Sequence, residues 1–122
     1  MDDDKKARLK TAVELVRNLR RKLTRELLDA IEKDKVDDPL TLEDNMRLVG
    51  TLEAVYNHLL AAIISDGDIY CAVKHLSYAL ILSGELEKPD VEEIYTIITI
   101  VTNSRIEPCA ACRAEETSAE EK

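Results

Sequence analysis

Residues 69–84 read IYCAVKHLSYALILSG, a segment with apolar side chains on nearly every side of a helix. Apolar residues at three- and four-residue steps define one face, while Tyr70 and Ile81 lie nearly opposite it. A helix without a polar face lies either at the centre of a bundle or in an interface. We therefore predict a helix over residues 69–83 that ends at Gly84, because glycine readily adopts the left-handed conformation at a helix C-terminus.

The sequence before this segment contains two further helical patterns. Apolar residues at three- and four-residue steps predict a long helix over residues 4–33 and a second one over residues 42–64. Pro39 interrupts helical continuity between them, and Thr41 followed by Asp44 resembles a capping box at the start of the second helix. A linker or tight corner is expected around the proline.

The last predicted helix, residues 91–103, is rich in β-branched side chains, which favour strands. Helical spacing of its isoleucines and the failure of strict alternation at Ile97 and Ile98 favour a helix instead. Pro89 and Asp90 are well placed to start this helix.

Four helices joined by short loops predict an all-α fold, either a four-helix bundle or two stacked antiparallel helical hairpins. A chain of 122 residues has the size of a single domain. Residues 1–105 would form this helical domain, with an aliphatic core because the chain contains no Phe or Trp. Residues 106–122, rich in Glu and Ala and without periodicity, would form a flexible, disordered acidic tail with a Cys-x-x-Cys motif.

Part of this helical pattern also matches a known repeat. The large anchor residues are Tyr56, Leu59 and Ile63, and the turn residues are Gly67 and Asp68. The small-large-small face consists of Ala72, Leu76 and Ala79. On these residues the segment 53–86 resembles one tetratricopeptide-repeat hairpin. Leu60 departs from the pattern, which expects a small residue there, and the pattern does not recur 34 residues away in either direction. The resemblance implies a helical hairpin and a function in protein binding, but no solenoid.

Charge is distributed unevenly along the chain. Its net charge is −8, yet residues 5–25 hold nine bases and one acid, which gives this segment +8 and the remainder −16. The bases cluster on one flank of the first helix, and the candidates for phosphate contacts are Lys10, Arg17, Arg20, Arg21 and Arg25. The acidic surplus and the scarcity of aromatic residues favour the alternative of a solvated or ion-paired face.

The three cysteines suggest one candidate metal site. Cys71 and His75 are four residues apart and share a helical face, and Cys109 with Cys112 could complete a tetrahedral Cys3His zinc site. Alternatively, Cys71 is a small buried residue and His75 an ordinary surface or core histidine. No cofactor is therefore expected, with zinc as the alternative.

Catalytic motifs are missing from the sequence. The two imidazoles, His58 and His75, belong to no nucleophile motif, phosphate loop or His-Glu-x-x-His pair, so we expect no enzyme. Three neighbouring helices leave part of the apolar third helix uncovered. The expected function is a small interaction module or accessory subunit that binds a protein partner, or itself as a homodimer, through a stripe containing Tyr70, Tyr78, Ile81 and Leu82. The alternative is a small nucleic-acid-associated subunit that uses the basic face of the first helix.

The location expected from the sequence is cytoplasmic. The longest apolar run, Leu59 to Ile64, has six residues, far fewer than the roughly 20 needed to span a bilayer. No apolar stretch follows the initial Met-Asp-Asp-Asp, so no leader peptide and no membrane partner are expected. The absence of Gln and the abundance of charge indicate a thermophilic source.

Overall fold

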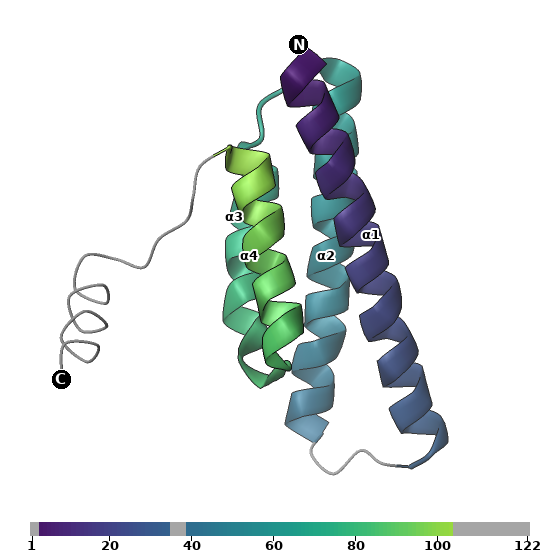
Figure 1. Cartoon of the computed structure of the whole chain (residues 1–122). Helices are drawn as coiled ribbons and strands as arrows, with labels where there is room; N and C mark the ends of the chain where they lie inside the picture. Colours follow the sequence, from purple (N-terminus) through teal and green to yellow (C-terminus); the bar gives the residue numbers. More distant parts are fainter. Residues whose placement is uncertain (1–2, 35–38, 104–122) are drawn as a thin grey trace, which may run out of the picture.

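The computed structural model describes residues 3–34 and 39–103, and these residues form four α-helices (Figure 1). The elements in chain order are α1 (Asp3–Glu32), α2 (Pro39–Ser65), α3 (Tyr70–Leu82), the 3-10 turn η1 (Ser83–Glu85) and α4 (Lys88–Thr102). The all-α fold is confirmed. The predicted tail, with Cys109 and Cys112, lies outside the described residues.

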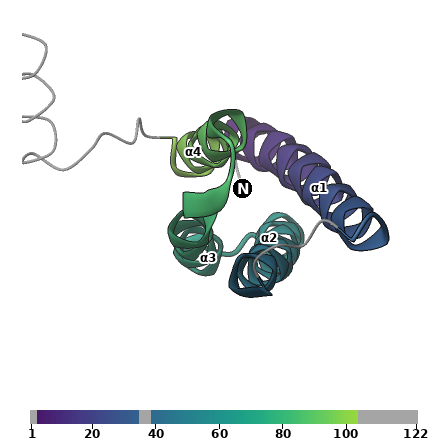
Figure 2. The same ribbon diagram turned by 90° about the horizontal axis from the view of Figure 1, so that it is seen from below.

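The helices form a ring in which each contacts its two neighbours. Contacts join α1 to α2, α2 to α3, α3 to α4, and α4 back to α1, as the end-on view shows (Figure 2). The two architectures expected from the sequence describe this one arrangement, a four-helix bundle composed of the α1–α2 hairpin and the α3–α4 pair. In the ring, α1 and α3 are diagonal to each other.

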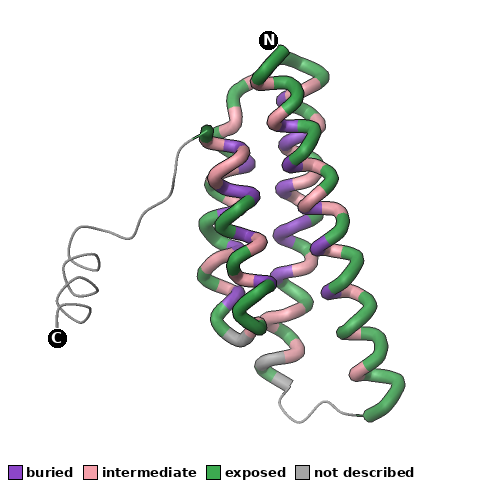
Figure 3. Tube along the Cα trace, in the orientation of Figure 1, coloured by how far each residue is buried: buried purple, intermediate pink, exposed green. Residues whose placement is uncertain are grey.

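The core is aliphatic, as the composition requires, and runs along the axis of the bundle (Figure 3). Its members are Leu9, Ala12, Val16, Leu19, Leu23, Leu48, Leu52, Val55, Leu59, Ala62, Ala72, Leu76, Ala79, Ile94, Ile97, Ile98 and Val101. Complete burial of a Leu, Ile or Val side chain contributes roughly 1.5–3 kcal/mol. All four helices contribute, so the fold depends on bringing four separate apolar stripes together.

The start of α2 differs from the prediction. The helix begins at Pro39, three residues before the expected start at Leu42, so Thr41 lies inside the helix and does not precede it as a cap. The physical reason is that proline lacks an N–H and has a fixed φ suited to the first helical position, where that N–H would have no partner.

The turn between α2 and α3 lies at the predicted place, but an aspartate has the left-handed backbone. Asp66 has φ 51°, and the Gly67 N–H donates to the Ala62 carbonyl at 3.1 Å, which closes the helix end. The Tyr70 N–H then donates to the Asp68 carboxylate at 3.0 Å, which gives the first N–H of the next helix a partner, while the N-cap residue Ile69 makes no side-chain cap.

The end of α3 contradicts the prediction for Gly84. No glycine in the chain has a positive φ, and Gly84 lies in η1, where the Leu86 N–H donates to the Ser83 carbonyl at 3.0 Å. The helix tightens into a 3-10 turn, which satisfies its last carbonyls without a left-handed residue.

The helical interpretation of the last segment is confirmed, and α4 begins three residues earlier than expected, at Lys88. Hydroxyl groups of Thr96, Thr99 and Thr102 donate to the carbonyl oxygens four residues before them, at 3.0, 2.9 and 2.8 Å. These bonds satisfy the threonine hydroxyls inside the helix, which is how a sequence of strand-like composition is accommodated.

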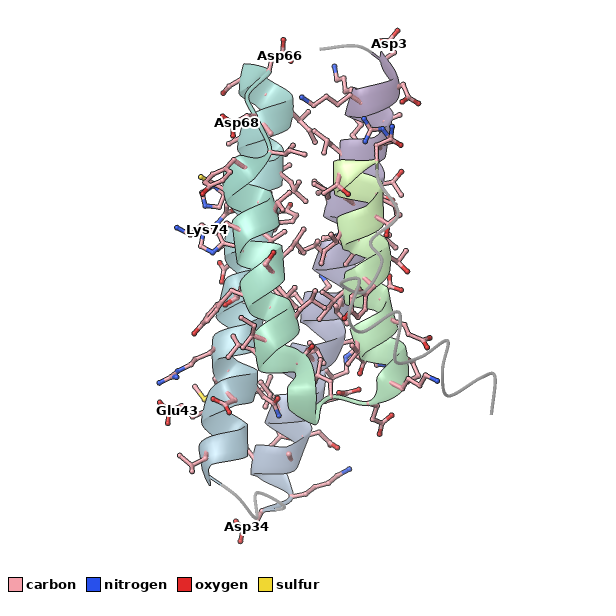
Figure 4. All side chains as sticks on the ribbon, turned by 90° about the vertical axis from the view of Figure 1, so that its left-hand side faces the viewer. Asp3, Asp34, Glu43, Asp66, Asp68 and Lys74 are labelled. Atoms are coloured by element: carbon pink, nitrogen blue, oxygen red, sulfur yellow. The ribbon has the colours of Figure 1, made fainter. Side chains whose placement is uncertain are left out.

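The two pairs of helices differ in length. Helices α1 and α2 have 30 and 27 residues, while α3 and α4 have 13 and 15. At ~1.5 Å per residue, the α1–α2 hairpin extends beyond the other pair, and its tip carries Asp34 (Figures 1 and 4). We call the part beyond α3 and α4 the α1–α2 end.

One helix meets the length and composition expected of a membrane span. Residues Leu42–Ser65 of α2 form a stretch long and apolar enough to cross a bilayer. Polar residues interrupt this stretch, so its longest uninterrupted apolar run is the six residues from Leu59 to Ile64. A helix that packs on two neighbours in a bundle has the same composition, and α2 contacts both α1 and α3. Length and composition alone therefore assign it no membrane role.

Candidate functional site

The exposed side of α3 is the first candidate surface. Tyr70, Lys74, Ser77 and Ile81 are spaced by four, three and four residues, which places them within about 60° of the helix circumference. All four are exposed, and the side chains of Tyr70 and Ile81 have relative exposures of 70% and 76%. We call these four residues the α3 outer face. Large exposed apolar side chains grouped on one face are typical of an interaction site.

Two more of the predicted partner-binding residues border this face, and their environments differ. Tyr78 is exposed, with a relative exposure of 45%, whereas Leu82 is half-buried and packs against the core. Leu82 therefore belongs to the flank of α3 that supports the bundle. Of the four residues singled out from the sequence, the exposed ones are Tyr70, Tyr78 and Ile81.

Sequence reasoning missed one further aromatic residue, Tyr95 of α4. Its exposure equals that of Tyr78. Asp90 and Glu93 line a hollow beside Lys22 of α1, and Tyr95 lies roughly 200° around α4 from Glu93, on the side away from α1. Three of the four tyrosines in the chain are thus exposed. The signal that could have found Tyr95 is an aromatic residue lying off the isoleucine stripe of its helix.

The α3 outer face is almost uncharged. Between Tyr70 and Leu82 the only formally charged residue is Lys74, in a chain with 25 acidic residues. Its side chain points away from the bundle (Figure 4). An interface core is depleted of charge and enriched in tyrosine, and this helix has both properties.

The proposed zinc ligands on α3 are only partly brought together. Cys71 is exposed, which differs from the buried cysteine of the alternative interpretation. The His75 ring stacks on His58 of α2, with ring centroids 4.9 Å apart and an interplanar angle of 14°. Among the described residues no group of three or more His, Cys, Asp or Glu side chains could hold a metal ion. The other two ligands, Cys109 and Cys112, lie outside the described residues.

The second candidate surface is the basic face of α1, and part of its charge is neutralised within the bundle. The Arg8 guanidinium lies 3.3 Å from the Asp4 carboxylate and donates to the Ile100 carbonyl of α4 at 3.1 Å. Lys22 donates to Asp90, a buried carboxylate of α4, at 2.6 Å. This hydrogen bond raises the pKa of the Lys22 ammonium above its ordinary value of 10.5.

The remaining bases of α1 that were singled out from the sequence have no ion pair with any described residue. Within the described part of the chain, no carboxylate lies within 4.0 Å of any of Lys10, Arg17, Arg20, Arg21 and Arg25. Arg21 and Arg25 are exposed, while Arg17 and Arg20 are half-buried on the flank. Within residues 3–34 and 39–103, the ion-paired alternative thus applies to Arg8 and Lys22 and not to these five residues.

A shallow hollow of about 280 Å³ lies on this basic face. It is lined by Arg20, Arg21, Thr24, Arg25 and Leu28, and we call it the Thr24 hollow. The Thr24 hydroxyl and the Nε atoms of Arg17 and Arg20 are shielded from solvent and have no hydrogen-bond partner among the described residues. Thr24 was not singled out from the sequence, where its position beside Arg20 and Arg21 was the available signal.

A smaller hollow, of about 120 Å³, lies where the α1–α2 end begins. Leu23 and Leu27 of α1, Leu48 of α2 and Leu86 contribute to its mainly apolar lining. It marks the place where α3 and α4 stop covering the longer hairpin.

Comparisons with known proteins do not identify the chain. No family model, no curated protein and no solved structure matches it. Helices α2 and α3 form a hairpin in which Leu59, Ala72, Leu76 and Ala79 are buried. The resemblance to a tetratricopeptide repeat stays a prediction.

Proposed function

We propose that this protein is a small non-enzymatic interaction module of the cytoplasm, and that its α3 outer face binds a second copy of the chain. One observation carries the proposal: Tyr70 and Ile81 are 70% and 76% exposed on a helix whose opposite side is completely buried. Removing such side chains from water on association is favourable in proportion to the apolar area buried.

A second copy suits this surface because the spacing of its four residues, by four, three and four positions, is the same from either end of the helix. Two α3 helices packed antiparallel about a two-fold axis would place Tyr70 of each copy against Ile81 of the other. Lys74 would then lie opposite Ser77, so the single charge on the face would not oppose itself. A two-fold interface requires this kind of self-complementarity.

The available area indicates a reversible dimer. A fully exposed aromatic side chain presents roughly 150–250 Å², so the exposed fractions of Tyr70, Tyr78, Tyr95 and Ile81 amount to several hundred Å² per copy. A stable interface buries about 800 Å² per partner. We therefore expect association on the order of micromolar, typical of smaller interfaces.

The same face also suits an accessory subunit of a larger complex. Exposed aromatic and aliphatic anchors along one helix fit the apolar groove of another protein as well as they fit a second copy. In that case the heterologous partner competes with self-association for Tyr70 and Ile81.

Sedimentation of the full chain over a range of concentrations tests the proposal. We expect reversible dimerisation that the double variant Tyr70→Glu/Ile81→Glu abolishes, because a carboxylate buried in the interface without a partner is costly. The matched control is Ile64→Glu, since Ile64 of α2 is 81% exposed and lies outside the α3 outer face. Circular dichroism would show that all three proteins remain helical.

The result decides between the two kinds of partner. A wild-type chain that stays monomeric at the highest concentration rules out the second copy. Capture of one protein from the native host by the wild type and by Ile64→Glu, but not by Tyr70→Glu/Ile81→Glu, would then support the accessory-subunit form. Failure of both measurements would overturn the α3 outer face as an interaction site.

A further inference from the structure

The basic face of α1 has a charge arrangement that the proposed α3 interface does not use. Arg17, Arg20, Arg21 and Arg25 lie within nine residues and have no ion pair among the described residues. Two of these pairs, Arg17 with Arg21 and Arg21 with Arg25, are spaced by four residues, and like charges at that spacing destabilise a helix. We call these four residues the arginine track. No carboxylate of the described residues compensates their mutual repulsion.

The Thr24 hollow supplies hydrogen-bond donors beside this charge. Arg20, Arg21 and Arg25 line it together with Thr24. Buried polar groups in folded proteins almost always have a partner, yet the Thr24 hydroxyl and the Arg20 Nε have none among the described residues. A tetrahedral oxyanion in the hollow would neutralise the guanidinium groups. Because the Thr24 hydroxyl is shielded from solvent, its side chain must turn about χ1 before the hydroxyl can donate to this anion.

The length of the arginine track indicates several anions rather than one. From Arg17 to Arg25 the helix rises about 12 Å at ~1.5 Å per residue. One strand of B-form DNA presents a phosphate about every 3.4 Å along its axis, so about three phosphates fit beside the track. Arginine and threonine are common phosphate contacts of nucleic-acid-binding proteins.

We propose that the arginine track and the Thr24 hollow bind the phosphate backbone of a nucleic acid. The track has no apolar anchor between Arg17 and Arg25 on its outer side, and Leu28 is the one apolar residue in the lining of the hollow, whereas an acidic protein partner would need a larger apolar interface core. None of the residues named for this surface is aromatic, so binding would depend on the backbone and not on base sequence. The proposal concerns a different helix and a different ligand from the α3 outer face, and it does not depend on dimerisation.

Glu14 limits the phosphate-binding surface on its N-terminal side. This exposed acid lies on α1 between Lys10 and Arg17, so a phosphate beside Lys10 would meet a like charge. We expect Lys10→Ala to weaken binding less than Arg21→Ala.

Fluorescence anisotropy with a labelled 20-base-pair DNA duplex, single-stranded DNA and single-stranded RNA, at several salt concentrations, tests the proposal. The logarithm of the binding constant should fall linearly with the logarithm of salt, with a slope of about −3 for the duplex and about −2 for single strands. The relative affinities of the three probes would show which nucleic acid the protein prefers.

Two double variants separate the track from the effect of net charge. Arg21→Glu/Arg25→Glu changes two exposed residues, so the fold should survive, and we expect at least a tenfold loss of affinity and a slope shallower by about two. The matched control is Lys33→Glu/Arg47→Glu, which changes the net charge equally at two exposed bases ion-paired to Asp29 and Glu43. Control and wild type should bind with similar slopes.

Thr24→Val tests the hollow itself, because it removes the hydroxyl without changing charge. Affinity should fall several-fold while the salt slope stays unchanged. An unchanged affinity would overturn the role of Thr24. Absence of salt-dependent binding to all three probes at low salt, or an equal loss in the two charge variants, would overturn the whole proposal.

Discussion

The outer faces of α1 and α3 differ in charge and in apolar content. The exposed side of α1 has Arg21, Arg25 and Lys10 without ion pairs among the described residues, while the exposed side of α3 has one lysine and large apolar groups. Because α1 and α3 are diagonal in the ring (Figure 2), these faces point in opposite directions. A dimer formed through α3 would leave both copies of α1 accessible.

This difference shows why the net charge of a chain is a poor guide to its surfaces. The value of −8 argues against nucleic acid. Among the described residues, the bundle nevertheless pairs Arg8 and Lys22 internally and offers the arginine track no ion pair. Screening limits surface electrostatics to about 8–10 Å at ordinary salt, so the local charge decides what can bind.

The largest effect on stability is expected on the buried side of α3. Leu76→Ala should lower the free energy of unfolding by about 2–5 kcal/mol, because Leu76 is completely buried. Ile81→Ala, on the opposite side of the same helix, should change stability by about 0.5 kcal/mol or less but weaken self-association. Urea unfolding and sedimentation measure the two quantities. Similar stability losses in the two variants would contradict the assignment of Ile81 to a free surface.

A smaller effect is expected for the bridge between Lys22 and Asp90. Lys22→Met leaves the buried Asp90 carboxylate without its cation, so the melting temperature at neutral pH should fall by several degrees. The pKa of Lys22 is raised in the folded state. The stabilisation is therefore fully present below the ordinary pKa of 10.5 and lost as the pH rises through the raised value.

Melting curves of wild type and Lys22→Met at increasing alkaline pH test whether this stabilisation is lost as the pH rises. The difference between the two proteins should disappear well above pH 10.5. A difference that persists undiminished would show that the aliphatic stem of Lys22, and not its charge, stabilises the contact.

A gain in stability is expected at an exposed glycine. A Cβ added at Gly50 of α2 would meet no atom within 4 Å, and glycine inside a helix costs roughly 0.5–1 kcal/mol relative to alanine. Gly50→Ala should therefore raise the free energy of unfolding by about that amount, measured in urea. Gly84→Ala is the comparison: a Cβ there also meets open space and φ is not positive, so a clear loss of stability would mean that η1 is wrongly described.

The smallest effect is expected when the arginine track of α1 is changed and dimerisation through the α3 outer face is measured. Arg21→Glu/Arg25→Glu should leave the dimerisation constant unchanged within error, because substitutions far apart with no shared partner act independently. Sedimentation of this variant beside the wild type is the measurement. A large change would show that α1 takes part in the dimer interface and would remove the separation of the two surfaces.

Most of the fold follows from apolar spacing, and the errors occur where backbone conformation has several solutions. The spacing located four helices, yet the start of α2 at Pro39 and the end of α3 before Gly84 differ from the prediction, and the left-handed residue of the second turn is Asp66. Each end can close in more than one way: with a proline at the first position, with a left-handed aspartate, or with a 3-10 turn. Their relative energies depend on neighbouring helices, which the local sequence does not reveal.

The candidate surfaces were predictable only in outline. Helical spacing identified the α3 stripe and the basic flank of α1, but it could not separate Leu82, packed on the core, from exposed Ile81. Nor could it show that Lys22 pairs with Asp90, 68 residues away, while Arg21 has no ion pair in the described part of the chain. Such distinctions depend on how the helices are rotated against one another, which is fixed by the packing of the whole core.

The unequal lengths of the helix pairs have a consequence for local opening. At the α1–α2 end, Leu28, Ile31 and Met46 are more than half exposed, and none of the other described helices covers the hairpin there. A segment with few buried contacts opens at a lower free energy than the global transition. Backbone amides around Leu28 and Met46 should exchange with deuterium well before those around Leu52.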